Sequence, residues 1–455
     1  MVILILLTVG GLTPLNAQSR WTFAAGEHFE VYTTGGDAVA RRALDDFDRI
    51  HTYLEDALHI PAISGPRTRL IIFNSREEFA PYASNPNVKA FYQSGVDGDF
   101  VVLPGLNGES FRAIAHEYSH LVSRRTGRHY PLWLDDGLAE YFSTVTPQGT
   151  KLQIGAAPGE RQRSLGFGVR LMPLEQLFAI TRDSADYNNP ARTGLFYAQS
   201  WALTHMLLTD ERYRDKSAGL LGKLAHGEPS ALALTSVYAK TVDEIARDLS
   251  KYTLRGNFRT TTVEAPLHPR AAAATTRPAT DFEARVAIAT LLGTNTARHT
   301  AALAAFAELE RQNPRDLTLL EAVGMFHVRA GRFDDARPYL ERAIALSTAN
   351  ARIYVHLAEI RANTPPDDVA AKSEEESLLD KALSLAPDDA EVRIMMARSL
   401  VRQLRGADAL AMLEPIARVP IEYERLFADT RAAALKILRR PADRSLPRGP
   451  GERRE

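Results

Sequence analysis

A repeat with a period of 34 residues constrains the fold of this 455-residue chain more than any other feature of its sequence. Ala336 and Leu340 lie one period after Ala302 and Phe306, so a small residue and a large apolar residue recur together. Such a period is typical of stacked helix pairs, in which small residues let two helices approach and large residues fill the gap. The second half of the chain is therefore expected to be all-α.

These positions resemble the tetratricopeptide family over roughly residues 282–420. Four units can be aligned; the third is longer by about five residues around Pro365-Pro366, and the fourth is weaker. The aligned positions are Ala302, Phe306, Gly324, Gly331, Ala336, Leu340, Ala343, Tyr354, Leu357, Ala358, Leu379, Ala382, Ala397, Ala409 and Leu413. The resemblance implies an all-α tetratricopeptide solenoid with a concave face that binds a protein partner. We assign residues 282–440 to these repeats and residues 441–455 to a disordered tail.

A second motif, at residues 116–120, carries chemistry. It reads His116-Glu117-Tyr118-Ser119-His120, an instance of H-E-x-x-H, and its apolar flanks suit a helix packed on two sides. Four residues advance a helix by about 400°, so the two histidines share a face and can both bind zinc. Glu117 lies next to them and can take a proton from a metal-bound water. The chain has no cysteine, so any metal must be held by His, Asp or Glu.

A catalytic zinc takes a third protein ligand, and residues 130–142 offer candidates. Asp136 and Glu140 are four residues apart and share a helix face. Two simpler explanations stand beside this one. Asp135 and Asp136 can complement the dipole of a helix that begins near Pro131, and Glu140 can be a solvated surface acid.

The combination of H-E-x-x-H with Trp133-Leu134-x-Asp136-Gly137-x-Ala139-Glu140-Tyr141 is similar to the gluzincin metallopeptidases, and most like the peptidase MA-like families. The resemblance implies that Asp136 is the third zinc ligand and that Glu140 holds His116 from behind. The spacing of Glu140 from His120 matches thermolysin-type sites, so Glu140 is the alternative ligand. The family usually has Glu where this chain has the shorter Asp136. That difference requires a closer helix and raises the prospect of an inactive relative.

Residues 194–205 resemble the Tyr-Ala-x-Ser-x-Ala helix of the same family. The resemblance implies that Tyr197, or alternatively His205, stabilises the oxyanion, with core packing of an aromatic-rich helix as the other reading of Tyr197. It also implies that the hairpin around Phe100-Val101-Val102 supplies an edge strand along which an extended peptide lies.

The first half is expected to be an α+β zincin-like metallopeptidase domain over residues 21–255. Strands are predicted at residues 29–33 and 69–73, and a helix at residues 38–58, from their periods of two and 3.6 residues. Residues 256–281 are rich in Thr, Pro and Ala and show little apolar periodicity, which predicts a linker. The two halves are therefore expected to unfold separately.

Residues 1–17 are predicted to be a signal peptide, because an uncharged apolar run ends near the small residue Ala17. The expected location is periplasmic or secreted, and membrane attachment is expected only if this segment stays uncleaved. Basic residues number 55 and acidic residues 56, which gives no electrostatic reason to expect a nucleic-acid partner. The chain is thus expected to be a zinc peptidase acting on a peptide or protein substrate. The alternative is a catalytically degenerate binding or scaffold protein that acts through its repeats.

Overall fold

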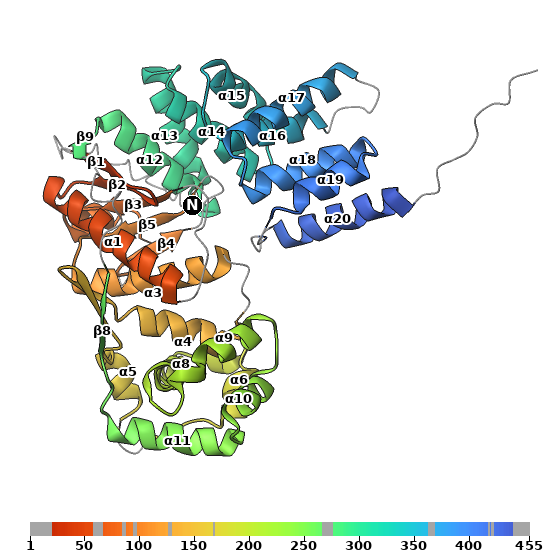
Figure 1. Cartoon of the computed structure of the whole chain (residues 1–455). Helices are drawn as coiled ribbons and strands as arrows, with labels where there is room; N and C mark the ends of the chain where they lie inside the picture. The colour runs from red at the N-terminus through yellow and green to blue at the C-terminus, as the bar shows by residue number, and fades with distance from the viewer. Residues whose placement is uncertain are drawn as a thin grey trace, which may run out of the picture.

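The computed structural model describes residues 21–439, apart from 58–66, 84–87, 94–97, 126–129, 167–168, 266–275, 363–368, 417–418 and 420–422. The predicted signal peptide and C-terminal tail lie outside the described residues. A sheet with helices on both faces, a group of helices below it and an array of helix pairs follow one another in Figure 1.

A mixed sheet with the strand order β4-β5-β3-β2-β1-β9 organises the first part. The pairs β2–β3 and β3–β5 are parallel, and the other neighbours are antiparallel. The strands are β1 (Thr22–Ala25), β2 (Phe29–Thr33), β3 (Thr68–Ile72), β4 (Phe91–Gln93), β5 (Phe100–Leu103) and β9 (Thr276–Pro278). The strand predicted at residues 29–33 is confirmed, and the one predicted at residues 69–73 is displaced by one residue.

Both faces of this sheet are covered, because successive side chains of a strand point to opposite sides. Leu70 and Ile72 pack with α1 (Asp37–Ala57) and α3 (Gly108–Arg125). Ile71 packs on the other side with α12 (Asp281–Gly293). The helix predicted at residues 38–58 is confirmed as α1, although Leu58 is outside the described residues.

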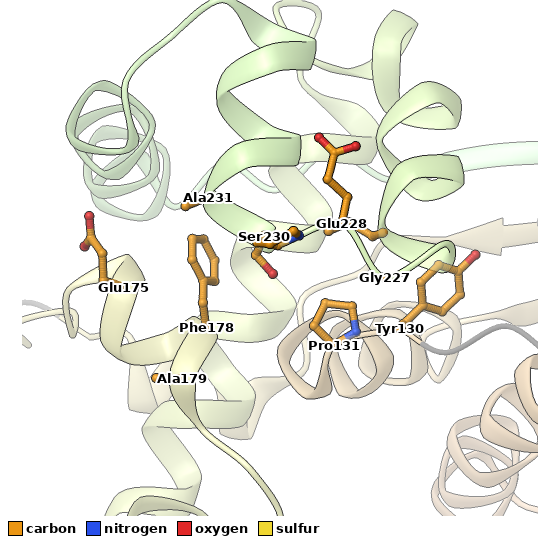
Figure 2. Close-up of a pocket in the computed structure, with 11 residues that line it drawn as sticks. Tyr130, Pro131, Glu175, Phe178, Ala179, Gly227, Glu228, Ser230 and Ala231 are labelled. Atoms are coloured by element: carbon orange, nitrogen blue, oxygen red, sulfur yellow. The ribbon is translucent and has the colours of Figure 1, made fainter.

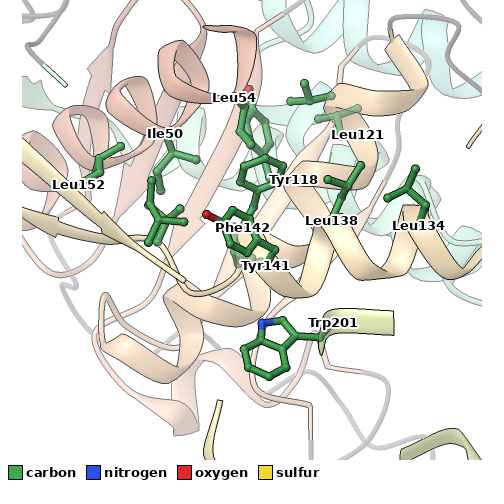
Figure 3. Close-up of a cluster of buried hydrophobic side chains, with 14 of the residues drawn as sticks. Ile50, Leu54, Tyr118, Leu121, Leu134, Leu138, Tyr141, Phe142, Leu152 and Trp201 are labelled. Atoms are coloured by element: carbon green, nitrogen blue, oxygen red, sulfur yellow. The ribbon is translucent and has the colours of Figure 1, made fainter. Parts of the chain in front are cut away.

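The second part is built around α4 (Leu132–Phe142) and α8 (Pro190–Thr209), which pack against each other. Figure 3 shows side chains from α1, α3, α4, β7 (Lys151–Ile154) and α8 meeting in one apolar core. The remaining elements of the first two parts are α2 (Arg76–Phe79), α5 (Gly159–Ser164), α6 (Leu174–Ala179), α7 (Ala185–Asn188), η1 (Arg214–Lys216), α9 (Ser217–Ala225), α10 (Ser230–Tyr238), α11 (Val242–Arg255), and a small antiparallel sheet of β6 (Thr146–Gln148), β7 (Lys151–Ile154) and β8 (Thr261–Glu264).

The third part is an all-α repeat region, as the 34-residue period predicts. Its elements are α12 with η2 (Thr296–Arg298) and α13 (His299–Gln312), α14 (Leu317–Arg329) with α15 (Phe333–Ala345), α16 (Ala351–Ala362) with α17 (Val369–Leu385), α18 (Ala390–Arg402) with α19 (Gly406–Leu413), and α20 (Glu424–Arg439). The repeated positions are core positions: Ala302, Ala336 and Leu340 are fully buried. A Cβ at Gly324 would lie 2.7 Å from a methyl carbon of Leu340, so a larger residue here would require the Leu340 side chain to shift.

The segment predicted as a linker, 256–281, contains two strands instead. β8 pairs with β7, and β9 joins the edge of the large sheet beside β1. The first repeat helix, α12, then covers the sheet with Ala284, Ala287, Ile288 and Leu291. Its opposite side packs on α13 and α14 through Val286 and Ala289. The two halves therefore share helix α12, whereas separate unfolding of the halves stays a prediction.

Candidate metal centre

The two histidines of the motif lie on α3, whose other face packs in the core. Ile114, Tyr118 and Leu121 are buried against α1, the sheet and α4. His116 and His120 project from the opposite side, one turn apart, with side chains 18% and 12% exposed. The packing of α3 thus sets the direction in which both imidazoles point.

Helix α4 presents three acids to this face of α3. It begins after Pro131, and most of its side chains, such as Trp133 and Leu138, are buried. Asp136 and Glu140 are 2% and 4% exposed. Buried carboxylates need a compensating partner, so the acids of α4 point to an electrostatic function.

The Nε2 atoms of both histidines and a carboxylate oxygen of Asp136 converge. The two Nε2 atoms are 3.3 Å apart, and Oδ1 of Asp136 lies 3.4 Å from Nε2 of His120. One ligand atom from each of the three residues falls within 4.8 Å of the others. Ligands around a tetrahedral zinc, with bonds of about 2.0–2.1 Å, lie about 3.3–3.4 Å apart. The spacings of His120 from His116 and from Asp136 fit such a site, and that of His116 from Asp136 is at most 4.8 Å.

A further carboxylate lies next to the Nδ1 atom of each imidazole. Nδ1 of His116 is 3.3 Å from Oε1 of Glu140, and Nδ1 of His120 is 3.1 Å from Oδ2 of Asp135. A carboxylate next to Nδ1 keeps the proton there and leaves the Nε2 lone pair for a metal. The structure thus places Glu140 behind His116, and Asp136 is the acid grouped with the two Nε2 atoms.

The electrostatics of the cluster favour a cation. Burial alone would lower the pKa of His120, but hydrogen bonds to Asp135 and Asp136 outweigh it and raise that pKa to about 9. Oδ2 of Asp136 is buried and has no hydrogen-bond partner among the described residues. An unpaired buried carboxylate oxygen beside two imidazole nitrogens is a donor set that suits zinc.

Arg161, on α5, was not predicted from the sequence. Its Nε and Nη2 donate to the two oxygens of Glu140 at 2.8 and 2.7 Å, and its guanidinium lies 5.0 Å from the ring centroid of Tyr197. Burial would raise the pKa of Glu140, but hydrogen bonds from Arg161 and His116 overcome it and lower that pKa to about 2. Arg161 lies 21 positions after Glu140, and no sequence pattern links the two residues. The proximity of Asp135 to His120 is likewise not predicted from the sequence.

Tyr197 lies at the cluster. Its ring centroid is 6.4 Å from that of His116, and its hydroxyl donates to Tyr187 at 3.2 Å. Burial, followed by the charge of nearby Asp136, raises its pKa above the ordinary value of a phenol. The hydroxyl therefore stays protonated and remains a hydrogen-bond donor.

His205 is a core residue rather than part of the cluster. It is fully buried, with Nε2 2.9 Å from the carbonyl oxygen of Gly155 and Nδ1 2.6 Å from the hydroxyl of Tyr252. Both ring nitrogens are therefore engaged away from the metal centre. The expectation that His205 stabilises an oxyanion is corrected, because neither nitrogen is available.

Glu117 is partly exposed on α3 and makes no hydrogen bond or ion pair with a described residue. The strand at this edge of the large sheet is not the one predicted from the sequence. β5, with Phe100–Val102, lies inside the sheet, and the edge is its hairpin partner β4. β4 also contacts α3.

A cavity of about 570 Å³ opens beside the start of α4 (Figure 2). Tyr130 and Pro131 form one side, Phe178 the other, and Ser230 lies between them. None of the residues of the metal cluster lines it. Among the described residues, no helix combines the length and apolar character needed to cross a membrane.

No protein-family model and no curated protein matches the chain. A thermophilic TPR protein of Thermus thermophilus is similar at 17% identity, over 34% of this chain and 87% of that one, with a TM-score of 0.28. A MamA mutant matches at 15% identity, over 38% and 88%, with a TM-score of 0.26. The MamA RS-1 ArsTM double mutant matches at 15% identity, over 46% and 91%, with a TM-score of 0.24. At such TM-scores, the description of the repeat region rests on its own helix packing.

Proposed function

We propose that this chain is a zinc-dependent peptidase. The observation that carries the proposal is the convergence of two Nε2 atoms and the Asp136 carboxylate, with a further carboxylate behind each imidazole. That pattern is typical of zinc sites with an open fourth position. The reaction class, peptide-bond hydrolysis, comes from the resemblance of the sequence to the zincin metallopeptidases.

His116, His120 and Asp136 would hold the zinc. Zinc bound there supplies Lewis-acid polarisation of a carbonyl and lowers the pKa of a water molecule. Glu117 follows His116 directly and makes no ion pair with a described residue, so its carboxylate is available to accept a proton and pass it to the leaving amine. Tyr197 would donate a hydrogen bond to the oxyanion by turning its hydroxyl away from Tyr187, and its raised pKa keeps that hydroxyl protonated.

A peptide substrate would add as a further strand to the edge of β4, which pairs with no other strand than β5 among the described residues. This edge ends the large sheet, and β4 contacts the helix that carries both histidines. Main-chain hydrogen bonds along an edge strand align an extended peptide without regard to most of its side chains. The proposed substrate class is therefore an extended peptide or a protein segment.

The decisive experiment compares the wild-type protein with Glu117→Gln on a mixed peptide library, each with its zinc content measured. Glutamine keeps the shape but cannot act as a base, so the variant should retain zinc and lose about 10²- to 10⁴-fold in cleavage rate. Glu109→Gln is the matched control, since Glu109 lies in the first turn of the same helix and is exposed. Equal cleavage by both proteins would indicate a contaminating protease.

A second candidate function is that of a scaffold whose peptidase domain has lost activity. The helix pairs α12–α19 favour it, since such arrays present an extended surface to protein partners. The first helices of successive pairs contact one another, and half-exposed ion pairs such as Arg398–Glu359 lie along this row. Zinc binding without cleavage of any peptide by the wild-type protein would favour the scaffold. Under either function, a location outside the cytoplasm remains a proposal that rests on the apolar run before Ala17.

A further inference from the structure

Two carboxylates of α4, one turn apart, compete for the same role at the metal centre. Asp136 and Glu140 share a face, and both are buried beside His116 and His120. Helix periodicity treats the two acids alike. The contacts of Arg161 distinguish the two acids, because its guanidinium donates hydrogen bonds to both carboxylate oxygens of Glu140.

We propose that Arg161 decides which of these acids completes the metal centre. By holding Glu140 behind His116, it reserves the ligand position for Asp136. This inference rests on the proposed zinc centre, but it concerns the ligand set and not the cleavage reaction. Arg161 acts as a positioning residue, because its contact with the metal centre runs through Glu140.

The physical argument is one of charge compensation. A bidentate arginine–carboxylate pair is among the stronger side-chain interactions, and Arg161 is itself only 19% exposed. Removing Arg161 leaves a buried carboxylate without its cation, which is costly. Glu140 lies on the Nδ1 side of His116, so the width of one imidazole ring separates it from the Nε2 cluster. The carboxylate released from Arg161 would turn toward the nearest remaining cation, the zinc.

The proposal predicts that one substitution has opposite effects in two backgrounds. In the wild-type background, Arg161→Met frees Glu140 from its position behind His116, and zinc affinity falls by about 10- to 100-fold. In the Asp136→Ala background, the same change frees Glu140 to replace the missing ligand, and zinc affinity rises by at least about tenfold. A merely structural role for Arg161 would lower zinc affinity in both backgrounds.

The experiment measures zinc dissociation constants by competition with a chelating dye, using the full chain in the four combinations. Arg163→Met is the matched control, because Arg163 is exposed on the same helix and should change nothing in either background. Circular dichroism and unfolding midpoints confirm that each variant is folded. Adding Glu140→Gln to the Asp136→Ala/Arg161→Met protein should abolish the gain and thereby identify Glu140 as the substitute ligand.

Lower zinc affinity in both backgrounds, or no change in either, would overturn the proposal. So would a gain in the Asp136→Ala background that survives Glu140→Gln. Failure of the peptidase function is a separate outcome. In that case, no library peptide is cleaved, but the wild-type protein binds zinc. Arg161→Met still lowers zinc affinity in the wild-type background and raises it in the Asp136→Ala background.

Discussion

The contact between α4 and α8 is tight at Gly137, and Gly137→Ala tests it. An alanine Cβ would lie 2.7 Å from the backbone carbonyl oxygen of Ser200 and 2.2 Å from Oγ1 of Thr204. Ordinary contacts of a Cβ begin at 3.4 Å, so α8 must retreat by about 0.7 Å to relieve the carbonyl contact alone. Thr204 is buried and β-branched, and it cannot swing aside freely.

Two contacts this short, one of them with a backbone oxygen, place the cost of overpacking in the upper part of its usual range, at about 2–3 kcal/mol, whereas the higher helix propensity of alanine returns about 1 kcal/mol. We therefore expect Gly137→Ala to lower the free energy of unfolding in urea by about 1–2 kcal/mol. Gly219→Ala is the control, since Gly219 lies in helix α9 with no atom within 4 Å of its added Cβ. It should be neutral or stabilising. A Gly137→Ala protein as stable as the wild type would refute the close approach of α4 and α8.

The remaining predictions concern the metal centre and His205. Asp136→Ala should abolish zinc retention, whereas Glu140→Ala should weaken zinc affinity by about 10- to 100-fold; the reverse order in a chelator competition would exchange the two roles. Asp135→Ala removes the carboxylate next to Nδ1 of His120 and should lower zinc affinity by a similar factor, and an unchanged dissociation constant would contradict that contact. Burial lowers the pKa of His205 to about 4, so the unfolded chain binds a proton that the folded chain rejects between about pH 6.5 and 4. The free energy of unfolding of the metal-free protein should therefore decrease as the pH is lowered from 6.5 to 4, by on the order of 3 kcal/mol at pH 4. The His205→Gln protein should lack this part of the pH dependence.

Elements whose pattern reflects local geometry could be predicted from the sequence. The β2 strand, Phe29–Thr33, and helix α1 show the periods of two and 3.6 residues that burial of one face imposes. The same logic places His116 and His120 on one side of α3, because a spacing of four residues fixes their direction wherever the helix packs. These predictions needed no knowledge of distant parts of the chain.

Contacts between distant segments could not be predicted in this way. Nothing in the sequence around Arg161 distinguishes it from Arg163, yet one is bonded to Glu140 and the other is exposed. His205 has the spacing expected of a catalytic residue and is nevertheless enclosed by the core. In each case, tertiary packing decides the role of the side chain.

The strands β8 and β9 escaped prediction for a different reason. Most of their side chains are exposed, so burial imposes no alternation on residues 261–264 or 276–278. Their pairing with β7 and β1 is made by backbone groups, which every residue type except proline supplies in full. The composition of residues 256–281, which is rich in Thr and Pro, therefore predicts a linker, whereas the chain forms two short edge strands there.

The position of α12 has a consequence for how this chain can change in evolution. Repeat arrays grow and shrink by duplication and loss of whole units. Here the first helix of the array also packs on one face of the large sheet, so its loss would expose part of the apolar cluster that contains Ile71. Duplication and loss are therefore confined to the distal end, toward α18–α20. Homologous chains are expected to differ in repeat number at that end and to retain α12 as the fixed first unit.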